Sequence, residues 1–207
     1  MSISKSDNSY SSIDSTAQNY ESKIVAGWEK LYKLKRAKLY QLLSEFYSGD
    51  AVLELGCGDG ESTKHLLKDF SSVDVVDASV AQLQRLEDKF DNVNTFSSYF
   101  EDFKPNKSYS TIVATSILEH LDNPLQLLDN CFDWLNPGGR LLISVPNALS
   151  IHRLVGVKLN MINSPYDLNH QDKLLGHRRV FDKNSMIDLI NHSNFKLIHF
   201  ACKYNSK

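Results

Sequence analysis

The chain has 207 residues, which is enough for one domain with a substantial core but too few for two full-sized domains. Its 23 basic and 25 acidic residues nearly balance, so no strong field of one sign would attract nucleic acid or an anionic membrane. The cysteines Cys57, Cys131 and Cys202 stand far apart and form no paired zinc or redox motif. We find no signal peptide and no apolar run of ~20 residues. These features predict a cytoplasmic protein that recognises a small molecule.

The predicted elements begin with a polar segment. Residues 1–19 are rich in serine, asparagine and aspartate, and we expect them to form a flexible tail. Over 20–48, apolar residues recur at roughly helical spacing with basic residues between them. This pattern predicts an N-terminal extension of one or two amphipathic helices in front of a single domain that covers 20–207.

From residue 51 onward, short apolar runs alternate with helical patterns. The predicted strands are 51–55, 73–77, 93–97, 109–115, 140–145 and 195–204, and the predicted helices are 62–70, 80–90, 124–135 and 183–192. Such alternation is typical of an α/β fold with a mainly parallel sheet and helices on both faces. Sheets of this kind bind ligands at the carboxyl ends of their strands.

Three glycines at alternate positions, Gly56, Gly58 and Gly60, follow the first predicted strand. Glycine tolerates positive φ in a tight turn and lets the backbone approach a ligand closely. A dinucleotide site would show G-x-G-x-x-G before a helix N-terminus, whereas this loop has the pattern G-x-G-x-G. Asp59 and Glu61 beside the turn would repel a pyrophosphate and suit a cationic ligand. The loop therefore predicts a positively charged ligand rather than a nicotinamide cofactor.

The run 52–60 resembles motif I of the class I S-adenosylmethionine-dependent methyltransferases. The blocks 75–79, 116–124 and 134–141 are similar to later motifs of that family and occur in the same order. The resemblance implies a Rossmann-like, doubly wound α/β fold, with S-adenosyl-L-methionine as cofactor and S-adenosyl-L-homocysteine as product. It also implies a last antiparallel hairpin, whereas this chain stops soon after 195–204.

The resemblance also assigns cofactor contacts. Glu54 matches the acidic residue that helps to hold the methionine end. Asp77 ends the second strand, at the spacing where a carboxylate can accept both ribose hydroxyl protons, although it could instead cap the next helix, for which Ser79 is better suited. Phe100 would lie against adenine and Glu101 or Asp102 would accept from its amine, unless these acids are merely solvated. The predicted cofactor-binding residues are Glu54, Gly56, Cys57, Gly58, Asp77, Ala78, Phe100, Glu101 and Ser116.

A long insert, 147–181, follows the strand predicted over 140–145, and we expect it to form the acceptor pocket and a lid. Removal of a proton from a hydroxyl acceptor near neutral pH suits histidine. The candidates are His120, His152, His170 and His177, of which His120 and His177 are the predicted catalytic residues, although each could have only a structural role. Methyl transfer needs mainly proximity and alignment, so no metal is predicted.

The same insert contains the predicted acceptor-binding residues His152, Arg178 and Arg179. The two arginines would depress the pKa of His177 and suit an anionic group such as a phosphate or a nucleotide sugar. They could instead form an exposed basic turn.

These observations predict methyl transfer to a hydroxyl of a small polar metabolite or glycan precursor. An N-methyltransferase acting on a small amine would need no strong base, and a catalytically silent methyltransferase-like subunit would only bind the cofactor or a protein. The intact glycine loop and Asp77 argue against silence. No nucleic-acid or membrane partner is expected, and a homo-oligomer is an open alternative because a second subunit would cover the exposed sheet edge.

Overall fold

The computed structural model describes residues 29–202. The predicted tail over 1–19 and residues 20–28 of the predicted extension lie outside this range. The described part begins with helix α2 (Glu29–Ser44), which confirms a helical segment ahead of the sheet. Its buried residue is Tyr40, which joins the apolar core.

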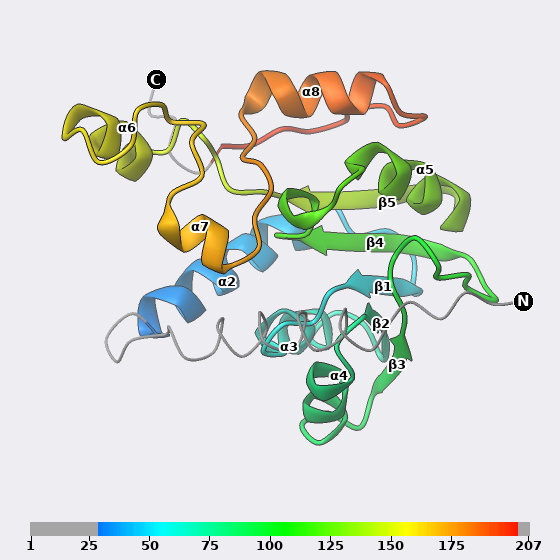
Figure 1. The fold of residues 1–207 in the computed structure, drawn as a ribbon. Helices are drawn as coiled ribbons and strands as arrows, with labels where there is room; N and C mark the ends of the chain where they lie inside the picture. Colours follow the sequence, from blue (N-terminus) through cyan, green and yellow to red (C-terminus); the bar gives the residue numbers. More distant parts are fainter. Residues whose placement is uncertain (1–28, 203–207) are drawn as a thin grey trace, which may run out of the picture. The chain divides into compact units, whose positions relative to one another are not determined.

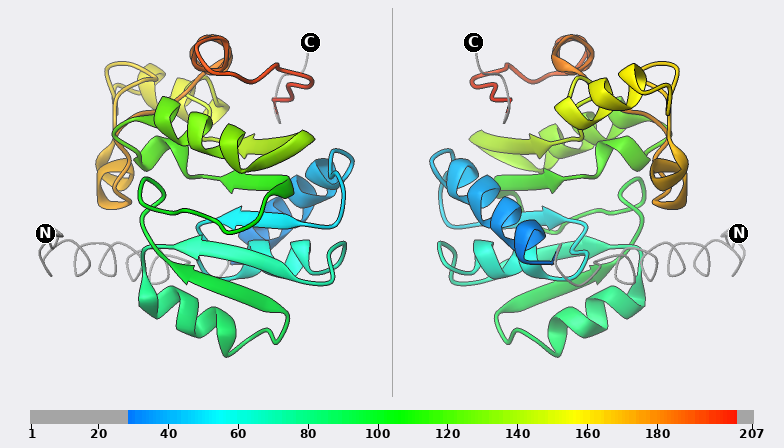
Figure 2. Two further views of the ribbon diagram at one scale, coloured as in Figure 1. Left: turned by 90° about the vertical axis from the view of Figure 1, so that its right-hand side faces the viewer. Right: turned by 90° about the vertical axis from the view of Figure 1, so that its left-hand side faces the viewer.

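Five strands form one sheet in the order β3-β2-β1-β4-β5 (Figures 1 and 2). They are β1 (Val52–Leu55), β2 (Val73–Asp77), β3 (Val93–Ser97), β4 (Tyr109–Thr115) and β5 (Leu135–Ser144). Strand β1 pairs in parallel with β2 and β4, and β2 pairs in parallel with β3. The predicted α/β class and the mainly parallel sheet are therefore confirmed. Because the chain passes from β3 to the other side of β1, the topological switch point lies between β1 and β4.

The central strands are apolar because both of their faces are covered. All four residues of β1 are buried, and in β2 the side chains from Val73 to Val76 are buried as well. Leu66 and Leu86 from the helices that follow these strands join the same core. This packing fixes the carboxyl ends of β1 and β2, where the predicted cofactor residues begin.

The described helices after β1 are α3 (Glu61–Leu66), α4 (Val80–Glu87), the 3-10 turn η1 (Leu118–His120), α5 (Pro124–Trp134), α6 (Ile151–Lys158), α7 (His170–Leu174) and α8 (Lys183–Asn191). The four predicted helices are observed as α3, α4, α5 and α8, and each observed helix ends earlier than predicted. Helices α6 and α7 lie within the predicted insert. None of the described helices has the length and apolar character needed to cross a membrane.

Two predictions about the last strands are wrong. The segment from Asn136 to Gly139, which lies between the predicted helix over 124–135 and the predicted strand over 140–145, belongs to β5, which begins directly after α5. Gly138 has φ +80°, and a Cβ on Gly139 would lie 2.9 Å from the Asn136 carbonyl oxygen, so these glycines permit the abrupt change from helix to strand. No strand forms over the described part of 195–204, in which Ile198 is exposed.

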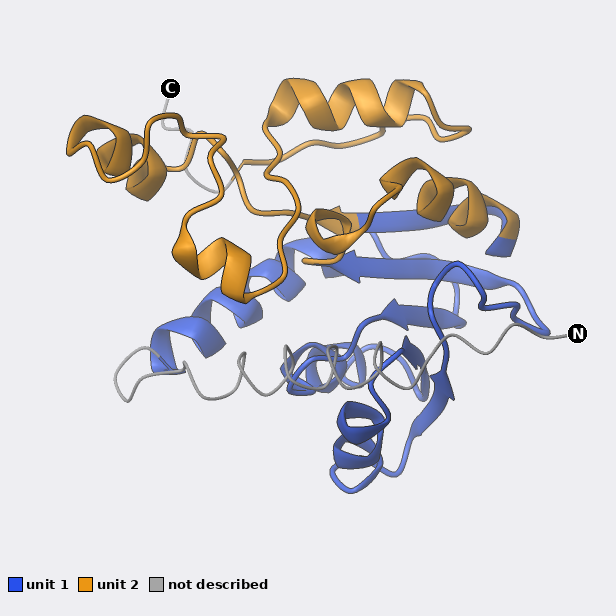
Figure 3. Ribbon diagram, in the orientation of Figure 1, with its two compact units in different colours: residues 1–115, 134–142 blue, residues 116–133, 143–207 orange. Residues whose placement is uncertain are grey.

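The described chain divides into two compact units (Figure 3). The first contains the chain up to Thr115 together with Trp134–Leu142, and it holds β1 to β4, most of β5, and the helices α2, α3 and α4. The second contains Ser116–Asp133 and the chain from Ile143 onward. The predicted cofactor residues up to Glu101 lie in the first unit, and the predicted catalytic and acceptor-binding residues lie in the second.

Candidate functional site

The glycine loop between β1 and α3 has the predicted left-handed turns. Gly56 has φ +74° and donates its backbone N–H to the Val76 carbonyl at 2.8 Å, which ties the loop to β2. Gly58 has φ +50°, and a Cβ placed on it would meet no described atom within 4 Å. By contrast, a Cβ on Gly60 would lie 2.9 Å from Leu86. Gly60 is therefore needed for packing, whereas the space beside Gly58 is open to a ligand.

Asp77, at the end of β2, organises this loop. One carboxylate oxygen accepts the Cys57 backbone N–H at 3.0 Å, and the other accepts the Ser79 N–H at 2.8 Å. The Ser79 hydroxyl accepts the Gln82 N–H at 3.3 Å and is the N-cap of α4, so the alternative of Asp77 as the cap is wrong. Burial and the negative charge of Asp77 raise the pKa of the Cys57 thiol, which stays neutral. Ala78 is half-buried between these groups.

Glu54, in β1, has a buried carboxyl group. It is 1% exposed, and Thr63 donates its hydroxyl to Oε2 at 2.6 Å. Its other oxygen, Oε1, has no hydrogen-bond partner among the described residues. Burial raises the pKa of Glu54 to about 8, opposed by the Thr63 hydrogen bond and the Arg36 charge. A buried carboxyl with one unsatisfied oxygen favours a ligand that brings a donor and a positive charge.

Helix α2 contributes residues to this region that the sequence analysis missed. Arg36 donates to the Thr115 hydroxyl at 3.1 Å, and the Tyr40 hydroxyl lies 3.2 Å from the same oxygen. Tyr40 also stacks on His65, with ring centroids 5.6 Å apart. The basic and aromatic spacing of α2 was visible in the sequence, but its contact with the end of β4 depends on tertiary packing.

The segment after β3 is anchored by Phe103. Its buried ring packs against Phe96 at 5.5 Å and Trp134 at 5.3 Å between centroids. Phe100 is half-buried and Glu101 is exposed, as is Asp102. Their contacts with an adenine ring stay a prediction.

The second unit begins with a constrained turn directly after β4. Ser116 has φ +58°, an uncommon conformation for a residue with a side chain, and donates its N–H to the Ser144 carbonyl at 2.8 Å. The turn η1 follows at once and carries Glu119 and His120. The chain thus presents these two side chains within five residues of the end of β4.

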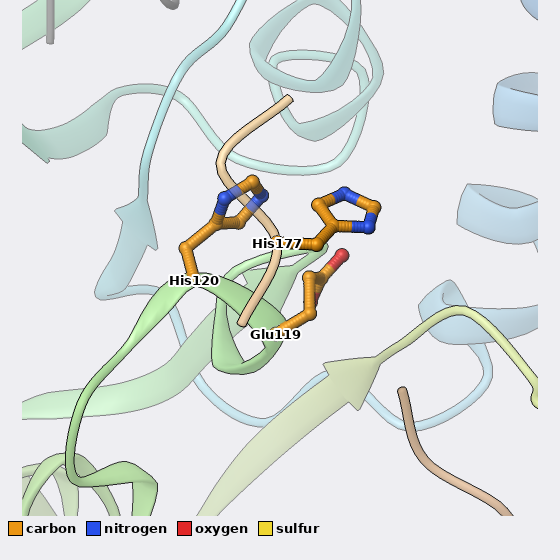
Figure 4. Close-up of side chains that lie close together, drawn as sticks. All are labelled: Glu119, His120 and His177. Carbon is orange, nitrogen blue, oxygen red and sulfur yellow. The ribbon is translucent and has the colours of Figure 1, made fainter. Parts of the chain in front are cut away.

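The structure brings His120 and His177 together from distant parts of the sequence (Figure 4). Their ring centroids are 4.8 Å apart and the rings are nearly perpendicular, at 82°. The buried Glu119 lies beside them, and its backbone carbonyl accepts the Arg178 N–H at 2.8 Å. One potential ligand atom from each of the three side chains lies within 4.8 Å of the others, so within the described residues this is the group that could hold a metal ion.

Both histidines are neutral near pH 7. Burial lowers the pKa of His120 to about 4, with smaller contributions from the nearby His177 and Arg178, against a hydrogen bond to the Gly176 carbonyl. Burial also lowers the pKa of His177, whereas Asp172 opposes that shift. The predicted cause of the low pKa of His177, its neighbours Arg178 and Arg179, is therefore not the main one. Each ring can accept a proton at neutral pH.

The predicted acceptor-binding residues have partners on the loop after η1. The Arg178 guanidinium pairs with the Asp122 carboxylate. Arg179 donates to the carbonyls of Leu121 at 2.7 Å and Asp122 at 3.1 Å. His152 on α6 is exposed, as is His170 at the start of α7. An anionic acceptor would have to compete with or add to the contacts of the arginines, and the binding role of these residues stays a prediction.

Together, the strand order, the glycine turn after β1 and the carboxylate at the end of β2 define a Rossmann-like α/β domain, a class that binds ligands at the carboxyl ends of its strands. The sequence matches the family described as "Methyltransferase domain" over residues 28–200. The chain therefore belongs to this family, and the predicted family is confirmed.

Several named relatives share part of the chain. The chain is 35% identical over 103 residues to a malonyl-acyl-carrier-protein O-methyltransferase of Halalkalibacterium halodurans, covering 45% of this chain and 38% of that protein. It is 31% identical over 98 residues to malonyl-acyl-carrier-protein O-methyltransferase 2 of Ilyobacter polytropus. That match covers 45% of this chain and 38% of that protein. The chain therefore spans less than half the length of these relatives.

A solved structure extends the likeness over most of the chain. The N-methyltransferase NodS from Bradyrhizobium japonicum superposes with a TM-score of 0.54 at 18% identity, covering 81% of this chain and 84% of that chain. At this level of identity the likeness concerns the fold, and it confirms the predicted Rossmann-like architecture.

Proposed function

We propose that this protein transfers a methyl group from S-adenosylmethionine to a hydroxyl of a small polar metabolite or glycan precursor. The observation that carries the proposal is Glu54, a buried carboxyl with one unsatisfied oxygen next to an open glycine turn. S-adenosylmethionine carries an ammonium group and a sulfonium, so it supplies both the donor and the positive charge that this carboxyl lacks. Membership of the methyltransferase-domain family supports the same reaction.

The first unit offers a separate residue for each part of the cofactor. Glu54 receives the amino group, the loop from Gly56 to Gly58 allows close approach, and Asp77 receives the ribose hydroxyls with the acceptor capacity of its carboxylate. Phe100 lies against the adenine ring, and Glu101 accepts from its amine. The bound cofactor supplies an activated methyl group, and the protein contributes position and alignment.

The second unit offers the proton acceptor. His120 and His177 are neutral at pH 7, and η1 carries His120 directly after β4, whose carboxyl end belongs to the ligand-binding edge of the sheet. We assign to this pair the removal of the hydroxyl proton. His152, Arg178 and Arg179 are assigned to the acceptor, which is anionic if the two arginines bind it directly.

Binding and turnover can be tested separately. Calorimetry should show that S-adenosylmethionine and S-adenosylhomocysteine bind in the micromolar range, ~8 kcal/mol. Incubation with labelled S-adenosylmethionine and pools of metabolites and nucleotide sugars should then identify by mass the molecule that gains the methyl group. Absence of heat with either ligand, combined with clear NADH binding, would overturn the proposal.

The Asp77→Ala variant should bind S-adenosylmethionine more weakly by ~1 to 3 kcal/mol, because two ribose hydroxyls lose a charged acceptor. Calorimetry measures the change, and Asp88→Ala, at an exposed site after α4, is the matched control. Thermal unfolding of both variants separates lost binding from a loosened loop, since Asp77 also holds the backbone at Cys57 and Ser79. Unchanged affinity would mean that Asp77 has only this structural role.

Alanine at Gly58 and at Gly60 should have opposite main effects. Both positions have positive φ, so each variant loses roughly 1 kcal/mol of stability to backbone strain. Gly60→Ala should lose more stability, because its Cβ meets Leu86, whereas Gly58→Ala has open space around its Cβ. We therefore expect Gly58→Ala to weaken cofactor binding at least about tenfold with a small drop in Tm, measured by calorimetry and thermal unfolding. Full affinity in Gly58→Ala would argue against a ligand beside Gly58.

A further inference from the structure

A buried arginine in the insert is unexplained by the proposed reaction. Arg153, on α6, is 3% exposed. Its Nε donates to the Pro165 carbonyl at 2.7 Å, one terminal nitrogen donates to Asp172 Oδ2 at 3.0 Å, and the other donates to the Asp167 carbonyl. A buried charge is costly unless it is paired and hydrogen-bonded, and this guanidinium is held on all three nitrogens. The planar fork therefore fixes the position of the Asp172 carboxylate.

Asp172 is held from three directions. Besides Arg153, its Oδ2 accepts the Asn169 backbone N–H at 2.9 Å, and its own N–H donates to the Asn169 side chain at 2.9 Å, which forms the capping box of α7. Its backbone carbonyl accepts the His177 N–H at 2.9 Å. The remaining oxygen, Oδ1, lies 3.3 Å from His177 Nδ1. These contacts fix the carboxylate of Asp172, and its Oδ1 lies near one nitrogen of the imidazole.

The other nitrogen of His177 is open to a further contact. The side chain is 6% exposed, and neither ring nitrogen forms a complete hydrogen bond among the described residues, but only Nδ1 has the Asp172 carboxylate within ion-pair distance, at 3.3 Å. The charged or titratable groups around the ring are Asp172, Arg153, His120, Glu119 and Arg178. A buried imidazole with one nitrogen facing a fixed carboxylate and the other unsatisfied has the arrangement of a histidine oriented for proton transfer.

We propose that Arg153 and Asp172 are positioning residues that keep the proton of neutral His177 on Nδ1, so that Nε2 is the atom that takes the proton of the methyl acceptor. That Nε2 takes a proton from the methyl acceptor rests on the proposed function, whereas the position of the proton on neutral His177 does not. In the transfer, the acceptor O–H bond breaks, its proton bonds to Nε2, and the oxygen electron pair forms the new O–C bond. The electron pair of the breaking C–S bond goes to sulfur. Asp172 then faces an imidazolium, whose charge it stabilises.

The tautomer can be measured in the full chain without any ligand. Long-range ¹H–¹⁵N correlation spectra at pH 8 distinguish a protonated from an unprotonated ring nitrogen, and loss of the signals in His177→Gln assigns them. We expect a protonated Nδ1 and an unprotonated Nε2 in the parent protein. In Asp172→Asn, the amide can still accept from Asn169 while its NH₂ faces Nδ1, so the proton should move to Nε2.

Matched variants separate positioning from general damage. Asp182→Asn changes the N-cap aspartate in the capping box of α8 and should leave the His177 tautomer unchanged. Arg153→Lys should keep part of the Nδ1 protonation that Arg153→Met loses, because a lysine can still pair with Asp172. If Asp172→Asn does not fold, the parent spectrum and the spectra of the two Arg153 variants show whether these residues set the His177 tautomer.

Activity gives a second readout. With the hydroxyl acceptor identified from the labelled pools, Asp172→Asn should lower kcat about 100-fold and leave the affinity for S-adenosylmethionine unchanged. A parent spectrum with the proton on Nε2, or an unchanged tautomer in Asp172→Asn, would overturn the inference. The expected tautomer in a protein that methylates no hydroxyl would support the positioning by Asp172 and overturn only the proposed acceptor.

Discussion

Replacing His177 with asparagine should lower kcat about 100-fold or more, because asparagine keeps hydrogen-bonding capacity but cannot take a proton near neutral pH. In the parent protein, the pKa of His177 lies below its ordinary value of 6.5. Its base form therefore predominates at pH 7, and kcat should fall as the pH drops below about 6.5. Steady-state kinetics from pH 5.5 to 8.5 with the acceptor identified from the labelled pools measures both effects.

His120→Asn decides which ring is the base. If His120 takes the proton, its variant should show the large loss in kcat, and the acid limb in the parent should lie near pH 4, because burial lowers its pKa to about 4. His192→Asn, at an exposed site after α8, is the control for histidine replacement. If His177→Asn and His120→Asn were both as active as the parent at every pH, the histidine-base mechanism would be wrong. A neutral amine acceptor would then become the leading hypothesis.

The strands of the central sheet could be predicted from the sequence because their positions along the chain follow local patterns. Strands β2, β3 and β4 have the predicted bounds, and β2 and β4 are mostly buried parallel strands, which are rich in apolar residues between polar turns. The apolar content of 195–204 also predicted a strand, but none forms over the described part of that segment. Strand formation there depends on a neighbour, and a neighbour is a property of the tertiary structure.

The two halves of the candidate site differ in how far the sequence predicts them. Glu54 and Asp77 follow from motifs because each stands at the end of a strand, and neighbouring parallel strands bring such ends together. His177 was predicted as a candidate, but Asp172 was not, although the pattern from Asn169 to Asp172 is typical of a helix cap. Nothing local marks Arg153 as buried, since basic residues on a short helix are usually solvated.

S-adenosylmethionine binding should release close to one proton at pH 7, and Glu54→Gln should abolish that release. Burial raises the pKa of Glu54 to about 8, so at pH 7 about nine-tenths of the free protein carries a neutral carboxyl. An ammonium group at Oε1 favours the charged form, and the proton leaves on binding. Affinity should therefore rise with pH up to about 8. Glutamine keeps an acceptor but not the charge, so we expect about 10- to 100-fold weaker binding.

Calorimetry in phosphate and in Tris counts the released protons, because the two buffers differ in ionisation enthalpy. S-adenosylhomocysteine has the amino group but no sulfonium, and it should release the same proton. 5′-Methylthioadenosine has neither the amino group nor the carboxylate, and it should release none. Glu87→Gln, on α4, should behave like the parent. Micromolar binding of S-adenosylmethionine with no proton release at pH 7 would contradict the contact between Glu54 and the ammonium, and equal release with 5′-methylthioadenosine would assign the proton to another group.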